Sequence, residues 1–184
     1  MSSADRIARF TAFATLGAMN TTQELARELL SSVDGADPEV VAEESLCLVA
    51  TATARAAEVG LQDAPSVGQA AAEALLALPF TYRDYLVGGA MIASQNAAYM
   101  DANEEVYQRL QRKQAFYGAH LPSGRFPGPR ALTDKMELWM GRVSPPGLPV
   151  MPAERLADLG LVDTVVTHLK LVLAFGRRGG TDGR

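Results

Sequence analysis

Cysteine and histidine are scarce in this sequence of 184 residues, which contains one cysteine, Cys47, and two histidines, His120 and His168. A single thiol cannot form a disulfide within the chain, and dithiol reduction of a peroxide by one chain needs a second thiol. One cysteine is also too few for a Cys₄ or Cys₂His₂ zinc site. Neither histidine has a glutamate three residues before it, which excludes a di-iron bundle of the Glu-x-x-His type. We therefore expect no metal and no redox cofactor.

Long apolar runs and clusters of positive charge are also lacking. No stretch reaches the roughly 18 uncharged apolar residues of a membrane-spanning helix. The run from Phe10 to Met19 is interrupted by Thr11, Thr15 and Gly17, so we interpret it as part of an amphipathic helix rather than a signal peptide. With 17 basic and 21 acidic side chains the net charge is −4, which disfavours nucleic acid as a partner. Together with the single cysteine, these features favour a cytoplasmic protein without a membrane partner.

The apolar residues have helical spacing, and no segment alternates with a period of two. A chain of this length forms one domain. We therefore predict an all-α fold, a compact multi-helix bundle at residues 1–177, followed by a disordered, glycine-rich tail at residues 178–184. The helices are expected at residues 2–16, 21–33, 38–59, 66–79, 81–117, 133–140 and 153–177, with loops at 118–129 and 144–152 and a bend at Gly160.

Start signals define several of these helices. Asp37-Pro38 is the clearest, because aspartate caps a helix and proline is favoured at the first helical position. The helix that follows is apolar or small on every side from Leu46 to Ala54, which predicts a buried central helix. Thr21 or Thr22 is expected to cap the helix before it, and Thr133 a later one.

The longest predicted helix, residues 81–117, begins after Pro79, which is expected to end the preceding helix. Gly88-Gly89 lies in the interior of this long helix at a cost of about 1 kcal/mol per glycine relative to alanine. We therefore expect a neighbouring helix to approach closely there. Glu105 and Arg109 are one turn apart and are expected to form a supporting ion pair.

Four segments between residues 86 and 161 carry motifs whose order along the chain is informative. Leu86–Tyr99 is a run of small residues that leads to an isoleucine, an asparagine and an aromatic residue. Phe126–Arg130 contains a Pro-Gly turn, Glu137–Trp139 follows it, and Leu156–Leu161 precedes a long apolar helix. In order and approximate spacing, from about residue 38 to residue 176, these segments resemble the alkylhydroperoxidase D proteins and the related carboxymuconolactone decarboxylases. The resemblance implies that family's helical bundle and its trimers or hexamers.

The chain lacks the family's catalytic motif, which is a Cys-x-x-Cys pair followed by a histidine. The resemblance places the two cysteines on Pro145 and Leu148 and the histidine on Pro152. The decarboxylases also have a histidine near this place. The resemblance therefore implies an inherited architecture with a degenerate dithiol site. It favours a non-peroxidase role in binding or assembly, with self-association into a trimer or hexamer.

Glu137 is the residue that still matches the family's catalytic pattern. Its apolar neighbours, Leu138 and Trp139 among them, are compatible with a partly buried acid of raised pKa. Such an acid could serve a peroxidase-related or decarboxylase-type enzyme that binds a small apolar ligand. Alternatively, Glu137 points outward and pairs with Lys135 or Arg142. The sequence leaves both interpretations, and whether the protein is an enzyme, open.

The thiol and the histidines are expected to be structural. Cys47 lies in the apolar part of the predicted central helix, and no histidine or lysine is one turn away to lower its pKa. His168 falls between Val166 and Leu169 in an apolar helix, which predicts a hydrogen-bonded histidine in the core or an interface. His120 lies beside a predicted loop and is expected to be more exposed.

Overall fold

The computed structural model describes residues 2–61, 63–94, 99–145, 147, 150–151 and 153–178, with the backbone alone at 3, 86–94, 99–103, 153–154, 156 and 178. Every regular element in these ranges is a helix, which confirms the all-α prediction. In chain order the helices are α1 (Ser3–Ser32), α2 (Pro38–Gly60), α3 (Pro65–Ser94), α4 (Tyr99–His120), α5 (Pro129–Val143), α6 (Ala153–Asp158) and α7 (Leu161–Arg178). No helix in the described ranges is long and apolar enough to cross a lipid bilayer.

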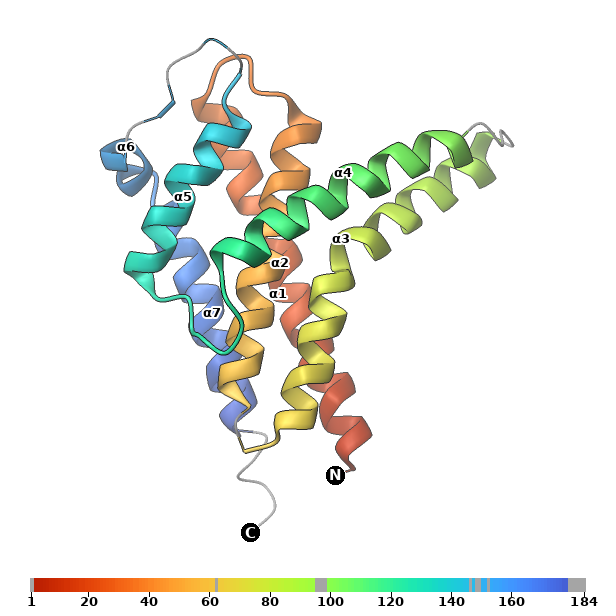
Figure 1. Cartoon of the computed structure of the whole chain (residues 1–184), viewed down its shortest axis with the longest axis vertical. Coiled ribbons are helices and arrows are strands. Elements are labelled where there is room, and N and C mark those ends of the chain that lie inside the picture. Colours follow the sequence, from red (N-terminus) through yellow and green to blue (C-terminus); the bar gives the residue numbers. More distant parts are fainter. Residues whose placement is uncertain are drawn as a thin grey trace.

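Helix α2 is the centre of the bundle and contacts α1, α3, α4, α5 and α7 (Figure 1). It begins as predicted. The Asp37 carboxylate accepts hydrogen bonds from the backbone N–H groups of Glu39 and Val40, at 2.8 and 3.3 Å, and Pro38 is at the first helical position. Every residue from 44 to 54 is buried, which confirms the prediction of a buried central helix.

The prediction of two N-terminal helices is wrong, because α1 is continuous. Ser2 caps it in a capping box with Asp5. Thr21 and Thr22, the predicted caps of a second helix, are buried in the helix interior. The buried positions continue past them to Leu25, so packing of α1 against its neighbours outweighs the local tendency of threonine to start a helix.

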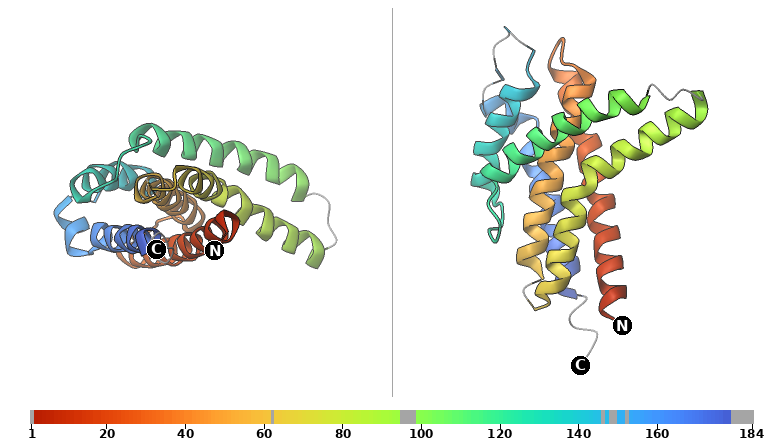
Figure 2. Two further views of the ribbon diagram at one scale, coloured as in Figure 1. Left: turned by 90° about the horizontal axis from the view of Figure 1, so that it is seen from below. Right: turned by 45° about the vertical axis from the view of Figure 1, so that its right-hand side comes forward.

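Pro79 lies at the middle of α3 and does not end it, contrary to the prediction. Proline lacks an N–H and its ring clashes with the preceding turn, so it bends a helix that packing keeps together. Figures 1 and 2 show that the first half of α3 runs along the bundle while the second half leaves it. The single helix predicted at 81–117 is therefore also wrong, since the second half of α3 and the first half of α4 form an antiparallel hairpin. We call residues 80–94 and 99–107 the helical arm.

The later helices agree with their predicted positions except at their ends. Helix α5 begins at Pro129, so Thr133 is inside it, and the Thr133 hydroxyl donates to the Pro129 carbonyl at 3.0 Å instead of capping. Gly160, with a φ of 65° that glycine adopts readily, separates α6 from α7 where a bend was predicted. The predicted tail includes Arg178, which is the last residue of α7, and residues 179–184 lie outside the described ranges.

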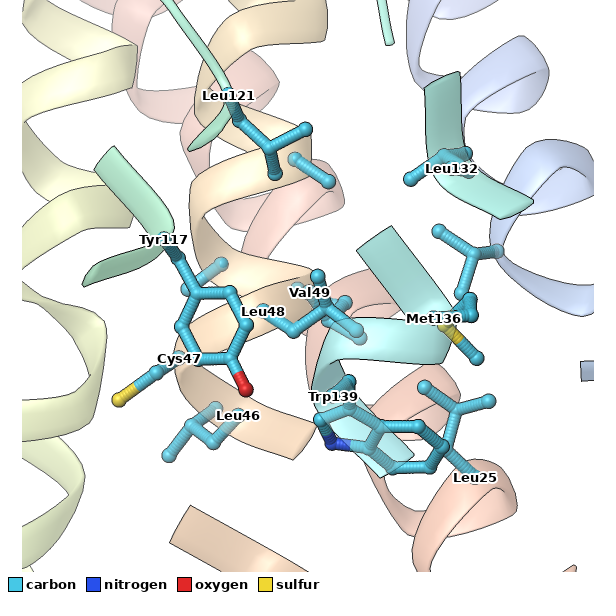
Figure 3. Close-up of a cluster of buried hydrophobic side chains, with 14 of the residues drawn as sticks. Leu25, Leu46, Cys47, Leu48, Val49, Tyr117, Leu121, Leu132, Met136 and Trp139 are labelled. Carbon is cyan, nitrogen blue, oxygen red and sulfur yellow. The ribbon is translucent and has the colours of Figure 1, made fainter. Parts of the chain in front are cut away.

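The core surrounds α2 on all sides. In Figure 3, Trp139 of α5 and Tyr117 of α4 pack around residues 46–49 of α2. A second apolar cluster, which includes Phe10 of α1 and Leu61 at the end of α2, fills the other end of the bundle. Apolar burial around one central helix is thus the main favourable contribution to this fold.

Gly17 of α1 marks a close approach between helices. A Cβ atom added there would lie 2.7 Å from Cε1 and 2.8 Å from Nδ1 of His168 on α7. We expect Gly17→Ala to lower the free energy of unfolding by about 1–3 kcal/mol, because the added methyl group overpacks the contact. Urea denaturation measures this change.

Gly141→Ala in α5 is the matched control, because nothing lies within 4 Å of its added Cβ. It should leave stability unchanged or raise it by up to about 1 kcal/mol. Equal effects of the two substitutions would contradict the close packing of α1 against α7.

Candidate functional site

Glu137, the catalytic candidate, lies on an exposed part of α5, whereas Trp139 faces the core and is fully buried. The two side chains therefore do not share a pocket. Arg142, one of the partners considered for Glu137, binds Glu44 instead. Proton transfer by Glu137 stays a prediction, and none of the described pockets is lined by it.

The segment that would carry the dithiol site follows α5. Pro145, at the first expected cysteine position, lies directly after Ser144, the C-cap of α5, and is not helical. Leu148 and Pro152 lie outside the described residues. Among the residues that the structure describes, no group of three or more histidine, cysteine or carboxylate side chains could hold a metal ion.

Cys47 is fully buried in α2, as predicted for a structural thiol (Figure 3). Burial raises its pKa to about 12, and the nearby negative charge of Glu44 acts in the same direction. Since the thiolate is the nucleophile in thiol chemistry, this side chain is unreactive at neutral pH in the folded chain.

His168 is a hydrogen-bonded core histidine, as predicted. Its Nε2 lies 2.9 Å from Oγ1 of Thr53 on α2. The Thr53 hydroxyl donates its one proton to the Val49 carbonyl at 2.7 Å, so it must accept the hydrogen bond from His168. The neutral imidazole of His168 therefore carries its proton on Nε2. Burial lowers the pKa of His168 to about 4. His120 is half-buried at the end of α4, and its Nδ1 lies 2.8 Å from the Phe116 carbonyl.

A cluster of charged and polar side chains joins α2 to α4 and α5. The members of this ion cluster are Glu39, Glu43, Glu44, Arg109, Lys113, Tyr117 and Arg142. Its three carboxylates are matched by three cations. The α4 members recur every fourth residue, so they lie along one face of that helix. This spacing is the one signal in the sequence that points to them.

Glu43 is held by two cations of α4. Arg109 donates to both of its carboxylate oxygens, at 2.8 and 2.7 Å, and Lys113 donates at 2.8 Å. Burial alone would raise the pKa of Glu43, but these hydrogen bonds outweigh it and hold the pKa below the ordinary value. Arg109 also binds Glu39 at 2.7 Å, so it pairs across to α2 and not with Glu105 as predicted.

Glu44 is the most deeply buried carboxylate of the ion cluster, with 2% of its surface exposed. It accepts from Nε and Nη2 of Arg142 at 2.7 and 2.9 Å and from the Tyr117 hydroxyl at 2.6 Å. Lys113 lies 3.4 Å away. Burial, and then the charge of Glu44, raises the pKa of Tyr117, which stays protonated as a donor. The pairing satisfies both oxygens of a carboxylate that could not otherwise be buried.

Described residues line two hollows, at different ends of α2. The first, which we call the root pocket, has a volume of about 170 Å³ between α1, α2, α3 and α4. It is lined by Met19, Thr22, Gln23, Ala26, Glu39, Ala42, Glu43, Leu46, Pro79, Tyr82, Arg83 and Leu110. The second, of about 390 Å³, lies beside Glu58, whose carboxylate is already bound by Arg55, Ser123 and the backbone N–H of Gly124. Of these two hollows, the root pocket is therefore the one that still has unpaired polar atoms in its wall.

No protein-family model, no curated protein and no solved structure matches this chain.

Removing the charge of Glu44 tests the ion cluster. Glu44→Gln leaves Arg142 without its buried counter-charge, while Lys113 retains Glu43, so we expect the free energy of unfolding to fall by about 3 kcal/mol. Glu39→Gln is the control, because 59% of that side chain is exposed and Arg109 retains Glu43; its effect should stay below about 0.5 kcal/mol. Urea denaturation of both variants measures this. A Glu44 variant as stable as the control would contradict the role of the cluster.

The buried imidazole of His168 predicts a pH dependence. Its folded pKa of about 4 lies below the ordinary value of 6.5, so the unfolded chain binds more protons between these values. Stability is therefore complete above about pH 6.5 and falls as the pH drops towards 4, by about 3 kcal/mol from this group. His168→Gln retains a donor for Thr53 but does not titrate. The difference in unfolding free energy between pH 7.5 and pH 4.5 should be smaller in this variant, and an equal difference would contradict the assignment.

Proposed function

We propose that this protein acts by binding and self-association rather than by peroxidase chemistry, and that the helical arm is its assembly element. The observation that carries this proposal is the arm itself, which leaves the bundle as a pair of helices (Figures 1 and 2). Between Asp84 and Asp101 the sequence contains no charged residue.

The arm can serve in assembly because a partner would bury the surface that the arm alone leaves exposed. A hairpin of two helices can cover only the faces that its helices turn toward each other, and helices that are apolar on every side are normally buried. Tyr85, at the start of the uncharged stretch, has 77% of its surface exposed, and Tyr82 is also exposed. Exposed aromatic side chains are enriched at protein interfaces.

A second copy of this chain is the partner that fits best. Recognition of a different protein normally uses complementary charges, which the uncharged stretch lacks. An uncharged apolar surface is complementary to itself, and most soluble oligomers are homo-oligomers. Gly88-Gly89 lies in this stretch, and small residues let helices approach closely. The resemblance described above implies a trimer or a hexamer.

The ion cluster supports the proposal because it fixes the root of the arm. Arg109, Lys113 and Tyr117 follow the arm directly on α4 and bind Glu43 and Glu44 of the central helix. The arm is thus presented at one angle to the bundle. Because the arm is already ordered, less conformational entropy is lost when two chains associate.

Membership of the alkylhydroperoxidase D-like family and a cytoplasmic location stay predictions. The single cysteine of the sequence, which is buried, argues against dithiol chemistry, and neither described pocket is lined by the exposed Glu137. We therefore propose no enzymatic function for this protein.

Light scattering coupled to size-exclusion chromatography tests this function. The wild-type chain, of 19.6 kDa, should elute at micromolar concentration with the mass of a trimer or hexamer. Tyr85→Glu combined with Ile92→Lys places charges on the arm, and the cost of burying them should raise the dissociation constant about tenfold or more.

Leu171→Glu is the control, because Leu171 is an exposed leucine on α7 and not on the arm. It should retain the wild-type mass. A monomeric wild type would overturn the proposal, and equal dissociation of the two variants would show that the arm is not the interface.

A further inference from the structure

The root pocket lies where the arm leaves the bundle, and most of its wall is apolar. Met19 and Ala26 of α1, Leu46 of α2, Pro79 of α3 and Leu110 of α4 line it. Its volume of about 170 Å³ is close to the roughly 150 Å³ of a cavity that admits a benzene-sized molecule. The pocket is thus large enough for a small organic ligand and too small for a peptide helix.

Two polar atoms in its wall have no hydrogen-bond partner among the described residues. The first is Oγ1 of Thr22, a residue with 7% of its surface exposed. Two other buried threonines, Thr51 and Thr53, each donate to the carbonyl four residues earlier. The second is the buried Nε of Arg83, on the other side of the same pocket. Buried polar groups are normally paired, so both atoms point to a ligand that completes them.

These two atoms define the chemistry of that ligand. The Nε–H of arginine can only donate, and a threonine hydroxyl can donate as well, so the ligand must offer an accepting oxygen. Glu39 and Glu43 also line the pocket, but Arg109 and Lys113 already bind their carboxylates. Among the charged residues that line the pocket, this leaves Arg83 without an ion-pair partner in the described part of the chain. A negatively charged acceptor therefore fits better than a neutral or cationic group.

We propose that the root pocket binds a small monocarboxylate with a short apolar tail. The carboxylate accepts hydrogen bonds from Thr22 Oγ1 and Arg83 Nε, and the tail, of about six carbons, packs against Leu46, Pro79 and Leu110. Tyr82 and Arg83 belong to both the arm and the pocket wall, but ligand binding and the mass of the assembly are measured separately. Each proposal can therefore fail without the other.

The test is an NMR titration of the full-length protein with hexanoate, hexan-1-ol and hexylamine as probes. Hexanoate should bind saturably, one molecule per chain, with a dissociation constant of about 1 mM or lower, and both other probes should bind at least about tenfold more weakly. No saturable hexanoate binding would overturn the proposal. Hexylamine binding as tight as that of hexanoate would overturn the assigned ligand class.

Variants locate the site. Arg83→Met and Thr22→Val should each weaken hexanoate binding about tenfold, because each removes one donor to the carboxylate. Ala42→Phe places a ring at the exposed rim of the pocket and should abolish binding without disturbing the core. Arg112→Met, an exposed arginine of α4 that does not line the pocket, is the control and should bind as the wild type does. Urea denaturation confirms that each variant is folded, and unchanged binding in a folded Ala42→Phe or Arg83→Met variant would place the site elsewhere.

Discussion

The neighbouring carboxylates Glu43 and Glu44 on the central helix are the constraint on which the rest of this structure depends. They lie next to a stretch of α2 that is buried on every side, where an unpaired charge could not remain. Arg109 and Lys113 compensate Glu43, and Arg142 compensates Glu44. The pairing therefore determines where α4 and α5 sit against α2.

The helical arm and the root pocket both follow from this arrangement. The cations of α4 hold the root of the arm on α2, while Pro79 bends α3 so that its second half leaves the bundle alongside α4 (Figure 1). The root pocket opens beside Glu43 at this point of departure. Because Glu43 is fully bound by its cations, the pocket keeps Thr22 and Arg83 as its unused donors. The charged junction between α2 and α4 thus lies beside both the start of the helical arm and the root pocket.

Local signals in the sequence predict the central helix well, and long-range contacts explain where such prediction fails. Asp37-Pro38 defines the start of α2 because capping depends on adjacent residues alone. The continuity of α1 past Thr21 and of α3 past Pro79 depends on packing against other helices, which no local pattern contains. The ion cluster was missed for the same reason, since Arg142 and its partner Glu44 lie on different helices far apart in the sequence. The resemblance makes Glu137 the catalytic candidate, but only the fold shows that its side chain is exposed.

A double-mutant cycle between Glu43 and Lys113 tests most directly whether the ion cluster holds α4, and with it the arm, on the central helix. Urea denaturation of the wild type, Glu43→Gln, Lys113→Met and the double variant gives the coupling free energy of this pair. Because the two side chains are 2.8 Å apart and largely buried, we predict a coupling of about 1 kcal/mol or more. A coupling below about 0.3 kcal/mol, the additivity expected of unconnected residues, would contradict the account.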